Sequence, residues 1–142
     1  MPLSRRHLLP LPLLLVLPGA LAGCKSAGIR DAFTSRDAAG RLKTDKFDRE
    51  QTEIHMIVEF VSGREDAVLL VELFVPEGSI AKFDQLEIAP GKGEHKIDIK
   101  MFIEDSQGNR VDDGPWDPGV YEADLLVDGE YDRTVKFEVL TE

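Results

Sequence analysis

The chain has 142 residues, enough for a single domain. Its 27 acidic and 17 basic residues give a formal net charge of -10. Such an acidic surface repels phosphate backbones and argues against a nucleic-acid partner. One cysteine allows neither an intrachain disulfide nor a thiolate metal cluster. With 31% charged and 42% hydrophobic residues, the composition is typical of a globular domain and excludes a disordered or polytopic membrane protein.

The N-terminal segment differs in composition from the rest of the chain. Arg5 and Arg6 precede an apolar stretch that runs from Leu8 to Leu21. This stretch is shorter than the roughly 20 apolar residues that span a bilayer, and its prolines interrupt a continuous helix. Arginines followed by a short apolar core are typical of a secretory signal peptide. We therefore expect residues 1–23 to be cleaved.

The end of this segment, Leu21-Ala22-Gly23-Cys24, resembles the lipobox of bacterial lipoproteins. The resemblance implies cleavage before Cys24, a diacylglyceryl thioether on its sulfur and acylation of the new amino group. The alternative is an ordinary secretory signal with an accidental cysteine, although the chain's sole cysteine stands where the box requires it. Two or more acyl chains make a stable anchor without a transmembrane helix.

Lys25 follows the lipidated position. In the sorting scheme that the resemblance implies, aspartate at this position retains lipoproteins in the inner membrane. Lys25 therefore favours the outer membrane, and we expect a lipid-anchored protein that faces the periplasm.

Residues 24–46 are polar and show no sustained hydrophobic period. The first interpretation is a flexible tether that lifts the folded domain from the membrane. The second is a short hairpin from Arg30 to Phe47 about the turn Asp37-Ala38-Ala39-Gly40, since Asp at the start and Gly at the end suit a type I turn. The first interpretation places the folded domain in residues 47–142.

The rest of the chain alternates apolar and polar residues, which is typical of strands with one buried face. The alternating segments are residues 54–60, 69–75, 86–88, 95–103, 121–127 and 135–139. Asp128-Gly129 between the last two is a strong hairpin signal. No segment shows a sustained helical period. The sequence thus predicts an all-β fold, an antiparallel β-sandwich of about six to eight strands.

The segment Asp117-Pro118-Gly119-Val120-Tyr121-Glu122-Ala123 resembles the D-x-G-x-Y-x-C start of strand F in immunoglobulin-like domains. The resemblance implies a structural role for Tyr121, whose hydroxyl would bond to the backbone upstream. Ala123 stands where those domains have a disulfide cysteine, and Trp116 lies in a loop, not on the central strand. A similar strand start in any other sandwich is the alternative, and it gives the same architecture.

The sequence offers little for catalysis. Lipidation would remove Cys24 as a nucleophile, and His55 and His95 sit in alternating segments where a structural role is expected. A two-histidine metal site would need the strands to bring both rings together, and zinc ligands usually have closer spacing. We expect no enzyme activity, no catalytic residue, no metal site and no cofactor beyond the lipid on Cys24.

Residues 104–117 form the most distinctive surface segment. Its carboxylate and amide oxygens are ligands that calcium prefers, but their spacing differs from an EF-hand, and the same residue types build turns. Trp116 is interpreted either as an exposed anchor for a partner or glycan, or as a cap on the open end of the sandwich. The candidate binding residues are Asp105, Asn109, Asp112, Asp113, Trp116 and Asp117.

The first functional hypothesis is a non-enzymatic, membrane-anchored lipoprotein whose domain binds another envelope protein as an adaptor or assembly subunit. The alternatives are a calcium- or glycan-binding module that uses residues 104–117, and an inhibitor of an envelope hydrolase.

Overall fold

The computed structural model describes residues 26–50, 53–77, 94–105, 107–111 and 115–141, and the backbone of residues 85–88. These residues form strands and connecting loops, with no helix among them, as the sequence predicted. Seven strands have four or more residues, which agrees with the expected number: β1 Ile29–Ser35, β3 His55–Phe60, β4 Leu69–Phe74, β5 Gln85–Ile88, β6 Lys96–Lys100, β9 Gly119–Val127 and β10 Glu130–Val139. Three strands have two residues each: β2 Lys46–Phe47, β7 Ile103–Glu104 and β8 Arg110–Val111.

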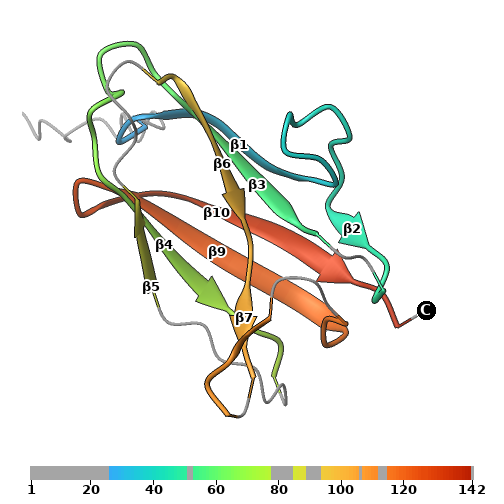
Figure 1. Cartoon of the computed structure of the whole chain (residues 1–142). Coiled ribbons are helices and arrows are strands. Elements are labelled where there is room, and N and C mark those ends of the chain that lie inside the picture. The colour runs from blue at the N-terminus through green and yellow to red at the C-terminus, as the bar shows by residue number, and fades with distance from the viewer. Residues whose placement is uncertain are drawn as a thin grey trace, which may run out of the picture.

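The strands form two facing sheets (Figure 1). The smaller sheet has the order β1-β3-β6, and the larger has the order β2-β10-β9-β4-β5. All pairs within them are antiparallel except β2 with β10, which is parallel. Strands β7 and β8 form a separate hairpin. The predicted β-sandwich is therefore confirmed.

Alternate residues of each sheet fill the space between the layers, because successive side chains of a strand point to opposite faces. Met56 and Val58 of β3 and Leu125 of β9 are fully buried in this shared core. Phe137 packs between two other aromatic rings, edge-on to Phe47 with centroids 5.8 Å apart and stacked on Tyr121 at 5.0 Å. The aromatic part of the core thus ties β2, β9 and β10 together.

The hairpin between β9 and β10 turns at Asp128-Gly129, as predicted. Both residues have positive φ, 49° and 82°. Two positive φ values define the type I′ turn, whose twist matches that of the flanking strands. The Asp128 carboxylate also accepts a hydrogen bond from the amide of Val68 at 2.9 Å, which fixes the loop before β4 against this turn.

The predicted tether over residues 24–46 is wrong for the part that the structure describes. Strand β1 begins at Ile29 and pairs with β3, so the sandwich includes residues well before position 47. The tether interpretation failed because β1 buries polar side chains. Thr34 is buried while its hydroxyl donates to the Thr44 carbonyl at 2.6 Å, and Ser35 is buried while its hydroxyl donates to the Asp37 carboxylate at 2.7 Å.

The alternative interpretation, a hairpin, is correct at its tip. The Gly40 amide donates to the Asp37 carbonyl at 3.1 Å, which closes the predicted turn, and the Thr44 amide donates to the Thr34 carbonyl at 3.1 Å. Beyond Thr44 the two arms diverge, because β1 belongs to the smaller sheet and β2 to the larger one. The N-terminal segment therefore links the two layers at one edge of the sandwich.

Candidate functional site

The predicted binding segment 104–117 begins as the β7–β8 hairpin. One oxygen of the Asp105 carboxylate accepts the amide protons of Gln107 and Asn109, each at 2.8 Å. Its other oxygen accepts the Asn109 side-chain amide at 3.2 Å. The bond from the Asn109 amide is the main reason that the pKa of Asp105 lies below its usual value. Asp105 and Asn109 thus close a turn, while Asp112 and Asp113 lie outside the described residues.

Trp116 is not an exposed anchor, which corrects that prediction. Its side chain is 0% exposed and packs edge-on against Tyr121 with ring centroids 5.7 Å apart. Its backbone amide donates to the Arg49 carbonyl at 3.2 Å. The exposed anchor was one of two interpretations, and the burial of the indole beside Tyr121, on which Phe137 stacks, favours the other, a cap on the sandwich. Its burial removes the aromatic surface on which a glycan-binding function depended.

The Tyr121 hydroxyl donates to the Asp117 carbonyl at 2.8 Å, the upstream backbone bond that the sequence resemblance implied. Burial raises the pKa of Tyr121 above its ordinary value, so the phenol remains a hydrogen-bond donor. Asp117 serves this bond through its backbone. Of the four predicted binding residues that the structure describes, Asp105 and Asn109 meet in a turn, while Trp116 and Asp117 contact Tyr121 near the start of β9.

His55 and His95 lie far apart, so they do not form the two-histidine metal site considered from the sequence. His95 stands across from Phe60, whose amide donates to the His95 carbonyl at 2.8 Å, and Phe60 is five residues from His55 on β3. Five residues of strand span about 16 Å. Over the ranges that the structure describes, no group of three or more histidine, cysteine, aspartate or glutamate side chains could hold a metal ion.

His55 is held in a structural role by two carboxylates. It is buried, with Nδ1 2.8 Å from the Asp98 carboxylate and Nε2 3.0 Å from the Glu53 carboxylate. Lys100 lies 3.1 Å from the second oxygen of Glu53. The hydrogen bond with His55, followed by that with Lys100, lowers the pKa of Glu53. This cluster joins the start of β3 to β6.

The lowered pKa of Glu53 predicts a loss of stability in acid. A carboxyl group whose pKa is lower in the folded state stabilises that state at pH values above its unfolded pKa, and the contribution disappears as the pH falls through the folded value. Starting from the ordinary value of 4.5, the free energy of unfolding should therefore fall as the pH is lowered below that value. Glu53→Gln should flatten this part of the profile, whereas Glu50→Gln, at an exposed position, should not. Urea unfolding curves at a series of pH values measure both, and equal profiles for the two variants would contradict the prediction.

A buried carboxylate that sequence reasoning missed fixes the first described residues. The Asp132 side chain is 1% exposed and accepts bonds from the Ser26 hydroxyl at 2.6 Å, the Gly28 amide at 3.1 Å and the Ile29 amide at 3.2 Å. Arg133 donates to its other oxygen at 2.6 Å and to the Ile29 carbonyl at 2.6 Å. Burial acts to raise the pKa of Asp132, but these hydrogen bonds outweigh it and lower the pKa. We call Ser26, Gly28, Ile29, Asp132 and Arg133 the N-terminal clamp.

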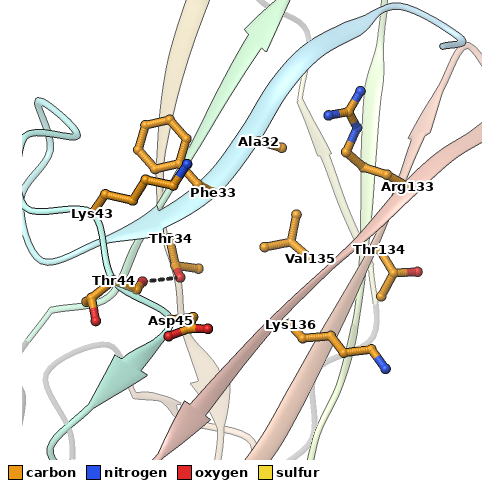
Figure 2. Close-up of a pocket in the computed structure, with 10 residues that line it drawn as sticks. All are labelled: Ala32, Phe33, Thr34, Lys43, Thr44, Asp45, Arg133, Thr134, Val135 and Lys136. Atoms are coloured by element: carbon orange, nitrogen blue, oxygen red, sulfur yellow. Dashed lines mark hydrogen bonds between the residues drawn. The ribbon is translucent and has the colours of Figure 1, made fainter.

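A groove lies between β1 and β10, where the two sheets meet without pairing (Figure 2). Its volume is about 430 Å³. Ala32 and Val135 point into the space between the strands, and Lys43, Arg133 and Lys136 stand around it. The remaining lining residues are Phe33, Thr34, Thr44, Asp45 and Thr134. We call this the edge groove. It joins residues about a hundred positions apart, so no local sequence signal could have indicated it.

No family model matches the chain, and no curated protein matches it either. In the described part of the chain, no helix is long and apolar enough to cross a membrane.

Proposed function

We propose that this chain is a lipid-anchored, non-enzymatic lipoprotein of the cell envelope, held in the outer membrane through Cys24, and that its sandwich binds another envelope protein. The observation that carries the proposal is the junction between lipobox and fold. Cys24 is the chain's only cysteine, and the N-terminal clamp begins at Ser26, so that Lys25 alone separates the anchor from the domain. A lipid on Cys24 would hold the sandwich directly at the bilayer surface.

The arrangement of the strands supports an immunoglobulin-like assignment for this domain. With β1, β3 and β6 as strands A, B and E, and β10, β9, β4 and β5 as G, F, C and C′, both sheet orders follow the immunoglobulin plan. Tyr121 then stands near the start of strand F, and its bond to Asp117 is the corner bond of such domains. Immunoglobulin-like sandwiches commonly act at cell surfaces, which agrees with a binding role.

The side chains that could have served catalysis or ligand binding have structural roles instead, which supports a non-enzymatic function. His55 is held by two carboxylates, Asp105 closes a turn, and Trp116 fills the core. The edge groove, in contrast, offers an accessible surface.

Membrane fractionation tests the anchor. Cys24→Ala should release the protein from washed membranes into the soluble fraction, because cleavage and acylation both require the thiol. Lys25→Asp is the matched variant, since it leaves the lipid site intact. It should stay in the membrane fraction but move from outer to inner membranes, according to the sorting scheme that the lipobox resemblance implies. Continued sedimentation of Cys24→Ala with washed membranes would contradict the proposal.

Cross-linking in intact cells tests the binding role. The lipidated protein should enrich one envelope protein, identified by mass spectrometry, and the Cys24→Ala form should not. Equal recovery of many proteins with both forms would contradict an adaptor function.

A further inference from the structure

The edge groove exposes backbone groups of β10 that have no strand beside them in the described part of the chain. The amide of Glu138 donates to the Asp45 carbonyl at 2.7 Å, and that of Leu140 donates to the Phe47 carbonyl at 2.8 Å. Backbone groups of every second residue point to the same side of a strand. The pairing of β10 with β9 is regular from Arg133 to Val139. The amides and carbonyls of Thr134 and Lys136 therefore point into the edge groove.

Strand β1 presents the opposite wall. The Thr34 carbonyl accepts the Thr44 amide, so even-numbered residues of this part of β1 turn their backbone groups away from β3. Ala32 shares this direction and faces β10 across the groove (Figure 2). The neighbouring strand β2 pairs with β10 only at Glu138 and Val139. The larger sheet therefore stops short along β10, and the edge groove lies beside the unpaired part of the strand.

The groove also has a charge opposite to that of the whole chain. Three cations, Lys43, Arg133 and Lys136, and one carboxylate, Asp45, line it, whereas the chain carries -10 overall. Asp132 compensates Arg133. Lys136, 64% exposed, forms an ion pair with Glu122 at 3.1 Å, and Lys43 lies 4.6 Å from the centre of the Phe33 ring. Because an exposed ion pair contributes little free energy, a negatively charged segment could compete with Glu122 for Lys136 while it meets Lys43, whereas a second copy of this acidic chain fits poorly.

We propose that the edge groove binds an extended, acidic segment of the partner protein, which adds to β10 as a further strand. Main-chain hydrogen bonds to Thr134 and Lys136 would supply affinity. Small side chains facing inward would contact Ala32 and Val135, and acidic side chains facing outward would lie near Lys43 and Lys136. This inference depends on the proposed binding function and names the surface and the kind of partner.

A peptide of generic sequence tests the inference, because strand addition relies on the backbone of the ligand. The probe is an acetylated and amidated hexapeptide of alternating glutamate and valine, added to the lipidated protein in detergent micelles. We expect saturable shifts of the Thr134 and Lys136 amide signals in NMR spectra and slower hydrogen exchange at both. A peptide with lysine in place of glutamate should bind at least about tenfold more weakly, because it meets like charge.

Two substitutions at Lys136 distinguish the contribution of its backbone amide to peptide affinity from that of its side-chain charge. Lys136→Pro removes an amide that points into the groove, at an edge position where proline is tolerated, and should weaken binding by about three- to tenfold more than Lys136→Gln, which removes the charge alone. Lys96→Gln removes a lysine on β6, outside the groove, and should leave affinity unchanged. If Lys136→Pro does not fold, a glutamate–valine peptide with alternate amides N-methylated gives the same comparison with the unaltered protein.

The outcomes distinguish this inference from the proposed function. Absence of saturable binding, equal binding of both peptides, or shifts centred outside the groove would overturn the inference. If the cross-linked envelope partner is retained by Lys136→Pro, the binding function stands and the edge groove is not its surface. If the acidic peptide binds as expected but no envelope protein is enriched in cells, the edge groove is supported as a binding surface and the adaptor function is contradicted.

Discussion

Replacing Asp132 with alanine is expected to lower the free energy of unfolding by about 3 kcal/mol or more, because it removes a buried carboxylate and leaves its hydrogen-bond donors unpaired. The Gly28 and Ile29 amides would lose their acceptor, and Arg133 would lose its ionic partner. Urea unfolding at neutral pH measures the loss. The first residues of the sandwich should also become accessible to limited proteolysis.

Two other variants define the cause. Asp132→Asn keeps the size and one acceptor oxygen of the side chain and should lose less stability than Asp132→Ala. Asp66→Ala removes a carboxylate at an exposed position and should change stability by less than about 0.5 kcal/mol. If Asp132→Ala were as stable as Asp66→Ala, the N-terminal clamp would not contribute to the fold.

Replacing Trp116 with alanine is expected to cost about 3–5 kcal/mol, because it opens a cavity beside Tyr121 where the indole is fully buried. Trp116→Phe should cost less, since it keeps an aromatic ring against Tyr121. Thermal or urea unfolding, followed by circular dichroism, compares the variants without depending on the indole.

Phe74→Ala is the matched control for this prediction. Phe74 is also aromatic, but it is 52% exposed, so its removal should cost much less than that of Trp116. Because Trp116 is the chain's only tryptophan, its fluorescence in the wild-type protein should resist quenching by acrylamide until the protein unfolds. Ready quenching in the native state would contradict the buried position.

The sequence predicted those strands whose buried residues are apolar. Ile97 and Ile99 of β6 alternate with charged residues, and both are buried as expected. The same rule failed at β1, where Thr34 and Ser35 are buried and their hydroxyls are satisfied by hydrogen bonds. Alternation of hydrophobicity cannot indicate a strand whose buried side chains are polar, because their burial depends on hydrogen bonds that the pattern does not show.

At the candidate sites too, contacts between residues close in sequence could be predicted, whereas contacts between distant residues could not. The Tyr121–Asp117 bond joins residues four positions apart, so a short motif could indicate it. Of the two interpretations of Trp116, the exposed anchor was wrong, because its proline and aspartate neighbours give no sign that the indole is buried against Tyr121. The N-terminal clamp joins residues more than a hundred positions apart, and their pairing depends on how the sheets stack.

The N-terminal clamp also determines how far an anchored domain could travel. Between a lipidated Cys24 and the fixed Ser26 there are two chain steps, a reach of roughly 7 Å when fully extended. A domain on so short a linker would stay in a thin layer along one leaflet. Its effective concentration would be high only for binding to molecules within that layer. A protein that binds such an anchored domain would therefore have to lie at the same membrane. A substitution at Asp132 that releases Ser26–Ile29 would lengthen the linker and let the domain move farther from the membrane. One buried carboxylate would then control both the stability of the domain and its distance from the bilayer.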